Sequence, residues 1–524
     1  MTTRRPGDLP LPANADGSEG HAPDPGAEQP AARPSRRGFL TAAAAAGSSL
    51  LAGCGATGSG AAPAQGAPEP RWSRLAARLE GELVPRGDLA YEARRGAVLW
   101  NARVPARYPA TIARVANALD VQTCVRFAAE EDLRVAVRGG GHSWIGAPLR
   151  DGALLIDLDR LRSVSIDPGL RRATAGPALR GRELLQHARP HGLGFPVGHC
   201  TSVPLSGFLL SGGFGWNSGV WGPACASVLG VELVDARGER LRADDATNPD
   251  LFWAARGAGP GFPGVVTRYE LALYPEPRAI RAAALLFDPA DAEAAGAWLA
   301  EVTPALPAEV EVLCFLTSWP VQDGSPRRLV VTATAFRDRE DEALADLRFL
   351  ERGREVAGAV LEPPVADALF QLSERVGRIF AEGHRYAADV LWSEATPATL
   401  LGALRDGLAE APSPKSFGML GLASAPPPDA PPLPAMALDL FAPAFAGLYG
   451  LWDDPAADAA NEAWFRAQQA RLQPLVTGHY VGESDLLAAP DRARRSFTDE
   501  GWRRLSALAR RHDPDGRFAS FPTS

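Results

Sequence analysis

The stretch VAVRGGGHSWIGAP, Val135 to Pro148, carries the most informative pattern in this chain of 524 residues. A short apolar run, typical of a buried strand, leads into three glycines and a histidine. These residues alone leave three interpretations open. They could form a turn that holds phosphate, a surface loop with an incidental histidine, or a point of covalent attachment.

Length and composition limit the classes of protein that the chain can belong to. At 524 residues, two or three domains are expected, and 46% hydrophobic with 22% charged residues is typical of a soluble globular protein. The 54 basic and 62 acidic residues give a net charge of −8, which argues against a nucleic-acid partner.

The cysteines are too few and too scattered for a disulfide scaffold, and no CxxC pair or His-rich cluster has zinc spacing, so no metal site is expected. We expect three of them to lie in the core: Cys124, Cys225 and Cys314.

The first 53 residues read as a disordered tail and an export signal, and they are set aside from the fold. Ser35-Arg36-Arg37-Gly38-Phe39-Leu40 and the short alanine-rich run after it resemble a twin-arginine signal. The run is too short to span a bilayer. The alternative is a chance Arg-Arg pair in a disordered tail.

Leu51-Ala52-Gly53-Cys54 resembles the lipobox of bacterial lipoproteins, whose cysteine is acylated after cleavage. We therefore expect an exported, periplasmic or extracytoplasmic protein that meets the membrane only through a lipid anchor at Cys54. Twin-arginine export carries folded proteins, typically ones that acquire a cofactor first, so a cofactor enzyme is the expectation.

The remaining chain divides by composition into four segments. Residues 54–70 are a small-residue and Pro linker, 71–276 alternate β-like and helical runs, 277–455 keep mixed patterning with Pro-rich loops, and 456–524 are helical. Within the second segment, apolar residues at helical spacing predict a helix over 111–131, followed by a strand over 133–138.

The glycines Gly139, Gly140 and Gly141 let the backbone approach a ligand and direct N–H groups at phosphate oxygens. A glycine triplet alone is weak evidence for a cofactor-binding loop, but the residues that precede it make the evidence stronger. Counted back from Gly141-His142, the residues Val135, Val125, Asp120-Val121 and Pro109 have the spacing of the signature for a covalent flavin histidine. The chain thus resembles vanillyl-alcohol-oxidase-type flavoproteins with a PCMH-type FAD-binding domain, specifically their berberine-bridge-enzyme-like branch.

Three further segments carry the resemblance. Residues 194–225 look like the second flavin segment of that family, 250–267 like the third, and HYVGESDL with RRHDPDGRF like its closing element. The resemblance implies an α+β fold: a PCMH-type FAD-binding domain of two α/β subdomains, and a substrate domain with an antiparallel sheet flanked by helices. The closing element, 456–524, would return to the FAD domain.

The resemblance also assigns residues to FAD. It implies covalent attachment through His142 and a second bond through Cys200; a buried structural cysteine is the alternative there. The other cofactor-binding candidates are Arg138, Gly139, Gly140, Gly141, Ser143, Gly198, Val203, Gly207, Gly212, Gly213, Gly215, Gly264 and Val265.

The sequence departs from the family pattern at several positions. Thr201 and Pro204 replace the usual Pro and Gly after Cys200, and Ala226 replaces a common Asp. In the closing motif, Gly482 and Glu483 stand where the family usually has Asn and a second Tyr. These losses weaken the transfer of the tyrosine base of the family.

Two residues of the closing motif are the candidate catalytic groups. Glu483 can act as a base if it is partly buried, and Tyr480 if its pKa is lowered. A second candidate wall is GHRYAADVLW, in which His384 and Tyr386 would share one strand face and Asp389 the other.

The resemblance implies a hydride transfer from an alcohol, a sugar or a secondary-metabolite hydroxyl carbon to FAD. Val203, three residues after Cys200, is the small option that the family associates with oxidases, so O2 is the expected acceptor and H2O2 the product. The alternatives are a dehydrogenase that passes electrons to a quinone or a protein, and a flavin-retaining binding lipoprotein without turnover. Substrate identity and oligomeric state stay open.

Overall fold

A computed structural model describes residues 70–200, 202–322, 324–423, 430 and 432–521. The export motif and Cys54 lie outside these residues. All described residues belong to one compact unit, Gln65–Ser524. Among the described residues, none of the helices combines the length and apolarity needed to cross a bilayer.

Two small sheets form the first half of the unit. One has the order β1 (Glu82–Pro85), β2 (Thr111–Arg114), β4 (Leu154–Asp157), β3 (Val135–Arg138), with β2, β4 and β3 parallel. The other is antiparallel, in the order β5 (Val164–Asp167), β6 (Arg172–Ala175), β10 (Val265–Ala272), β8 (Val228–Val234), β9 (Arg240–Ala243). A short pair joins β7 (Leu193–Gly194) to β11 (Tyr274–Pro275).

The apolar spacing predicted one helix over residues 111–131, and this prediction is wrong. The segment first makes the buried strand β2, and α3 (Ala118–Glu130) begins only after Asn117. The side chain of Asn117 accepts hydrogen bonds from the backbone N–H of Leu119 and Asp120, which starts the helix there. The apolar face of α3 then packs on the parallel sheet, and Cys124 is part of that core. The strand predicted before the glycines is confirmed as β3.

The second half is built on a large antiparallel sheet of eight strands. Its order is β15 (Val360–Asp367), β12 (Ala279–Phe287), β14 (Arg327–Arg337), β13 (Val310–Ser318), β17 (Phe417–Leu422), β18 (Ala444–Trp452), β16 (Arg385–Ser393), β19 (Gly478–His479). Side chains alternate between its two faces. Val312, Cys314 and Leu316 enter a core with the covering helices, whereas Leu313 and Phe315 face the opposite way.

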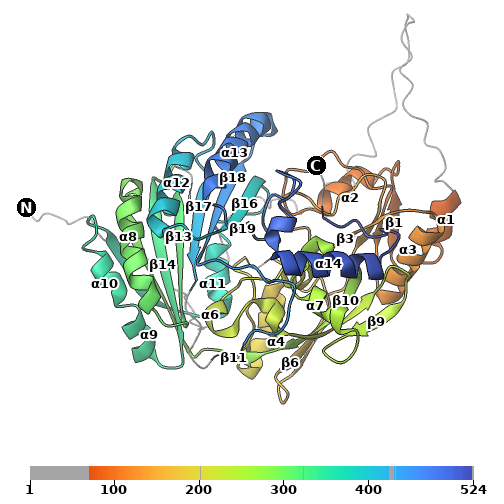
Figure 1. Ribbon diagram of the computed structural model, residues 1–524, viewed down its shortest axis with the longest axis horizontal. Helices are drawn as coiled ribbons and strands as arrows, with labels where there is room; N and C mark the ends of the chain where they lie inside the picture. Colours follow the sequence, from red (N-terminus) through yellow and green to blue (C-terminus); the bar gives the residue numbers. More distant parts are fainter. Residues whose placement is uncertain (1–69, 201, 323, 424–429, 431, 522–524) are drawn as a thin grey trace, which may run out of the picture. The chain divides into compact units, whose positions relative to one another are not determined.

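Helices cover the outer face of this sheet, and others surround the smaller sheets (Figure 1). Those on the large sheet are α8 (Ala292–Val302), α9 (Glu340–Asp346), α10 (Phe349–Gly353), α12 (Pro397–Ala409) and α13 (Asp458–Leu472). The remaining helices are α1 (Pro70–Ala76), α2 (Tyr91–Ala97), α4 (Gly181–Ala188), α5 (Leu205–Leu210), α6 (Ser218–Trp221), α7 (Pro249–Ala255), α11 (Leu369–Val376) and α14 (Asp499–His512).

The C-terminal segment contacts both halves. Its strand β19 extends the large sheet at β16, and α14 packs beside α7 (Figure 1). Beyond α14, the backbone N–H of Val135 donates to Arg517 and the N–H of Ala519 donates to Val135. The end of the described chain therefore pairs with β3, the strand that leads into the glycine loop.

Candidate active site

A cavity of about 330 Å³ lies between the glycine loop and the inner face of the large sheet. Most of the candidate residues line it. They are Gly139, Gly140, Gly141, His142, Ser143, Gly198, Cys200, Val203, Gly207, Gly264, Val265, Tyr480 and Glu483.

The glycine triplet fits closely against its own protein. A Cβ on Gly139 would lie 1.8 Å from the Ser206 oxygen, and one on Gly140 would lie 2.0 Å from the ring of Pro204. Gly141 has a positive φ of 77° and would collide with a carbonyl oxygen. Packing therefore requires glycine at all three positions, while their backbone borders the cavity.

His142 leaves the loop with its imidazole beside the cavity. The ring stacks on Trp100, with the centroids 5.0 Å apart and the planes 23° from parallel. Burial lowers the pKa of His142 to about 3, so the ring is neutral near pH 7. Cys200 lines the same cavity, 3.3 Å from the hydroxyl of Ser202, and burial raises the pKa of its thiol.

Four of the candidate residues do not line the cavity. Arg138 instead donates to Asp157 and to the carbonyl oxygens of Val98 and Gly140, so it fixes the end of β3. Three glycines shape the neighbouring loop: Gly212, Gly213 and Gly215, of which Gly215 forms a β-bridge with Gly198.

Glu483 is partly buried in the cavity wall, as its predicted role as a base requires. The hydroxyl of Tyr449 donates to its carboxyl over 3.0 Å. Burial raises the pKa of Glu483 above the ordinary 4.5, while the hydrogen bond from Tyr449 acts in the opposite direction. The side chain of Trp144 also forms a hydrogen bond with this carboxyl. A carboxyl with a raised pKa that is held in place in this way is suited to accept a proton.

Tyr480 does not meet the condition set for it as a base. Its oxygen accepts a hydrogen bond of 3.1 Å from the backbone N–H of Gly213, and its ring packs on Phe214 and Trp392. Burial raises, rather than lowers, the pKa of its hydroxyl. Tyr480 is therefore a neutral phenol of the cavity wall.

The second candidate wall is only partly as expected. Asp389 lies on the opposite strand face from Tyr386, as predicted, and forms an ion pair with Arg492. His384 contacts Asp453 instead of Tyr386, and the Tyr386 hydroxyl donates to the carbonyl of Ala381. Neither His384 nor Tyr386 reaches the cavity; Val390 and Trp392 of the same strand do.

Comparison with known proteins identifies the family. The profile of an FAD binding domain matches residues 109–244. The FAD-linked oxidoreductase nodO of Hypoxylon pulicicidum is 30% identical over 432 residues, which cover 80% of this chain and 92% of that protein. The chain belongs to the FAD-linked oxidoreductases.

Two further proteins are similar to this FAD-linked oxidoreductase. The (R)-6-hydroxynicotine oxidase of Paenarthrobacter nicotinovorans is 37% identical over 226 residues, 43% of this chain and 48% of that protein. The crystal structure of 6-hydroxy-D-nicotine oxidase from Arthrobacter nicotinovorans has a TM-score of 0.73 at 24% identity, and the match covers 84% of this chain and 96% of that one. The predicted PCMH-type α+β fold is confirmed.

The residues at the glycine-lined end of the cavity fit the FAD of this oxidoreductase. A Cβ on Gly207 would meet no protein atom within 4 Å, so it would occupy cavity space. Two buried polar atoms that line this region, Ser206 Oγ and Arg150 Nε, have no protein partner. Burial lowers the pKa of Arg150 to about 10, and an anionic diphosphate would offset that burial.

Sequence reasoning about this oxidoreductase missed a histidine–glutamate pair at the cavity. His199 Nε2 lies 2.6 Å from Glu311 Oε1, and the other oxygen of Glu311 accepts from the N–H of Asn217. His199 lines the cavity beside Cys200. An acidic residue within the apolar strand VEVLCFLTS was the one signal that could have indicated this pair.

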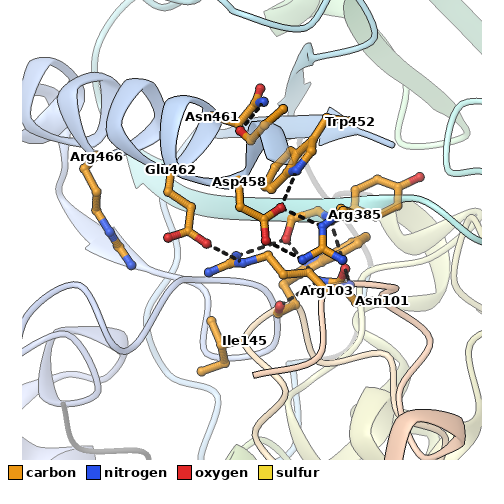
Figure 2. Close-up of polar contacts among 12 residues, drawn as sticks. Asn101, Arg103, Ile145, Arg385, Trp452, Asp458, Asn461, Glu462 and Arg466 are labelled. Atoms are coloured by element: carbon orange, nitrogen blue, oxygen red, sulfur yellow. Dashed lines mark hydrogen bonds and ion pairs between the residues drawn. The ribbon is translucent and has the colours of Figure 1, made fainter. Parts of the chain in front are cut away.

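Behind the loop that follows His142, a second hollow of about 250 Å³ is lined by charged side chains (Figure 2). Arg385 binds Asp458, which also accepts from the indole of Trp452 over 2.7 Å, and Arg103 pairs with Glu462 at 2.7 Å. We call it the charged hollow.

Asn101 connects the charged hollow with the loop. Its amide group donates to the carbonyl oxygens of Trp144 and Tyr386, both at 3.0 Å (Figure 2). Its own oxygen accepts from the N–H of Tyr386. Asn101 thereby fixes strand β16 of the large sheet against the loop that carries His142.

Proposed function

We propose that this FAD-dependent oxidoreductase is an oxidase of hydroxyl-bearing carbons, with O2 as the acceptor and H2O2 as the product. The observation that carries the proposal is Glu483, the one carboxyl among the described residues that line the cavity, which accepts a hydrogen bond from Tyr449 and whose pKa is raised by burial. When bound, FAD supplies the hydride acceptor. Glu483 removes the hydroxyl proton, and Tyr449 holds its carboxyl in place.

The choice of oxygen as acceptor rests on Val203, which lines the cavity with a small side chain. Rapid mixing of the photoreduced enzyme with air-saturated buffer tests it, because an oxidase regains its flavin absorbance quickly and produces H2O2. Slow reoxidation by oxygen together with fast reoxidation by a quinone would instead identify a dehydrogenase.

We propose that FAD is attached to the protein through His142 and also through Cys200. Both residues line the cavity, and the neutral imidazole of His142 has a free electron pair for the bond. The test is acid precipitation followed by mass analysis of the flavin peptides. Flavin on peptides with both residues supports the proposal, and flavin in the supernatant contradicts it.

We also propose that the protein is exported by the twin-arginine route and acylated at Cys54. The support is the sequence alone, Arg36-Arg37 before a short apolar run that ends at Leu51-Ala52-Gly53-Cys54. Labelled fatty acid should be incorporated into the wild-type protein and not into Cys54→Ser. Export of an Arg36→Lys, Arg37→Lys variant at the wild-type level would contradict the route.

A further inference from the structure

The large sheet presents an almost wholly apolar surface to the cavity. Four adjacent strands, β13, β17, β18 and β16, contribute to it. The side chains on this surface, which we call the sheet wall, are Leu313, Phe315, Met419, Phe445, Tyr449, Val390 and Trp392. Tyr449 is the one with a hydroxyl group, and that group is bound to Glu483.

Glycines in the sheet make room for the aromatic rings of the wall. A Cβ on Gly421 would lie 2.0 Å from the ring of Phe445, and a Cβ on Gly447 would lie 2.6 Å from the ring of Tyr449. Any other residue at either position would displace the ring. Glycine at these two strand positions therefore leaves the rings of Phe445 and Tyr449 where they are.

The polar groups near the sheet wall are few, and among the described residues the buried indole N–H of Trp392 is one that has no hydrogen-bond partner. The carboxyl of Glu483 accepts from Tyr449, His199 is paired with Glu311, and the Ser484 hydroxyl donates to a backbone carbonyl. Among the described residues that line this side of the cavity, Glu483 is the one acid. A substrate therefore meets one base, Glu483, and one unpartnered donor, the indole N–H of Trp392, which is too few for the several hydroxyl groups of a sugar.

This arrangement discriminates between classes of alcohol. A sugar can stack on an aromatic ring, but its several hydroxyl groups lose water on entry and need partners. An aromatic or alicyclic alcohol gains from the same wall by burying apolar surface, and its single hydroxyl meets Glu483. The wall therefore favours the second class.

We propose that the substrate is a predominantly apolar aromatic or alicyclic alcohol, bound against the sheet wall with its single hydroxyl at Glu483, and that mono- and oligosaccharides are excluded. This inference rests on the oxidase function proposed above. The carbinol loses a hydride and a proton and becomes a carbonyl. Glu483 takes the proton, a bound FAD would supply the hydride acceptor, and O2 takes up the hydride and the proton and leaves as H2O2.

The test is an anaerobic titration of the flavin-loaded protein. Two apolar alcohols, 1-phenylethanol and cyclohexanol, are compared with glucose, xylose and cellobiose, and the flavin spectrum reports both binding, as a saturable shift, and reduction, as bleaching. We expect a response to an apolar alcohol and none to the sugars at a concentration about 100-fold higher. A sugar that responds as strongly, or silence from both alcohols up to their solubility, overturns the inference.

The two proposals fail in different ways. A spectral shift without bleaching would contradict the oxidation and leave the apolar site intact, because binding does not need turnover. Bleaching by a sugar would support oxidation and overturn the apolar site.

A pair of variants adds a test of the wall itself. Met419→Gln keeps the length of the side chain and places an unpaired amide in the wall, so binding of the responding alcohol should weaken by about 10-fold. The matched control Met419→Leu stays apolar and should bind within about 3-fold of wild type. Equal binding by both variants, with both folded by circular dichroism, would contradict the inference.

Discussion

The cavity and the charged hollow differ in whether their charged side chains form ion pairs. Both are lined by Trp144 and Ile145. In the charged hollow, acids and arginines are paired with each other, as in Arg385–Asp458 and Arg103–Glu462. In the cavity, Glu483 has no ion pair among the described residues and stands in an apolar wall. The Arg103–Glu462 pair joins the two halves and the Arg385–Asp458 pair joins α13 to β16, whereas Glu483, which has no ion pair in the described part of the chain, is available for chemistry.

The largest effect should come from removing the unpaired acid. Glu483→Gln keeps the shape and the contact with Tyr449 but cannot accept a proton, so anaerobic flavin reduction by substrate should slow by about 10² to 10⁴-fold. Glu462→Gln, an acid of the charged hollow, is the control and should leave the rate within about 2-fold. Equal loss in the two variants would remove the distinction between the hollows.

The next effect concerns stability. Asp458→Asn breaks the pairing with Arg385, whose side chain is 15% exposed, and should cost about 1–3 kcal/mol of unfolding free energy. The exposed pair Arg339–Asp341 gives the control, because water screens this pair and Asp341→Asn should leave the free energy of unfolding close to that of the wild type. Urea unfolding followed by fluorescence measures both. A loss at Asp341 as large as at Asp458 contradicts a structural role for the hollow.

The pH dependence of flavin reduction should follow Glu483. Because burial raises its pKa, the carboxyl is protonated and inactive at low pH, and the rate should rise with pH through a midpoint above 4.5 to a plateau. Stopped-flow rates from pH 4 to 9 measure the profile, and Glu483→Gln should be flat over the same range. A wild-type rate that falls across this midpoint would exclude Glu483 as the base.

The smallest effect should come from the partner of the base. Tyr449→Phe keeps the ring in the wall and removes the hydrogen bond that stabilises the ionised carboxyl. The midpoint of the pH profile should therefore move upward, with a plateau rate within about 10-fold of wild type. An unchanged midpoint would show that Tyr449 acts on the shape of the wall alone.

The sequence predicted the flavin loop because its information is local. The glycines, His142 and the spacing back to Pro109 lie within one segment, and so do the residues around Cys200. The His199–Glu311 pair joins residues 112 positions apart, and the Tyr449–Glu483 hydrogen bond joins strand β18 to the loop after β19. No local pattern contains such a pairing.

One prediction was wrong, and the condition set for another was not met, for related reasons. The helix over 111–131 was predicted too long, because apolar spacing could not show that Thr111–Arg114 would pair with β4. Tyr480 was expected to act if its pKa fell, but its burial against Phe214 and Trp392 raises the pKa. Tertiary packing decided both outcomes.

The pairing of residues 517–519 with β3 has a consequence for the timing of assembly. Arg517 donates to the carbonyl of Leu133, 384 residues earlier in the chain, and Phe518 forms a bridge with Val135. Phe518 and Ala519 also line the cavity. During synthesis this segment emerges 384 residues after Leu133, so this part of the wall closes only once residues 517–519 have been made. A nascent chain stalled before residue 517 should therefore retain no flavin.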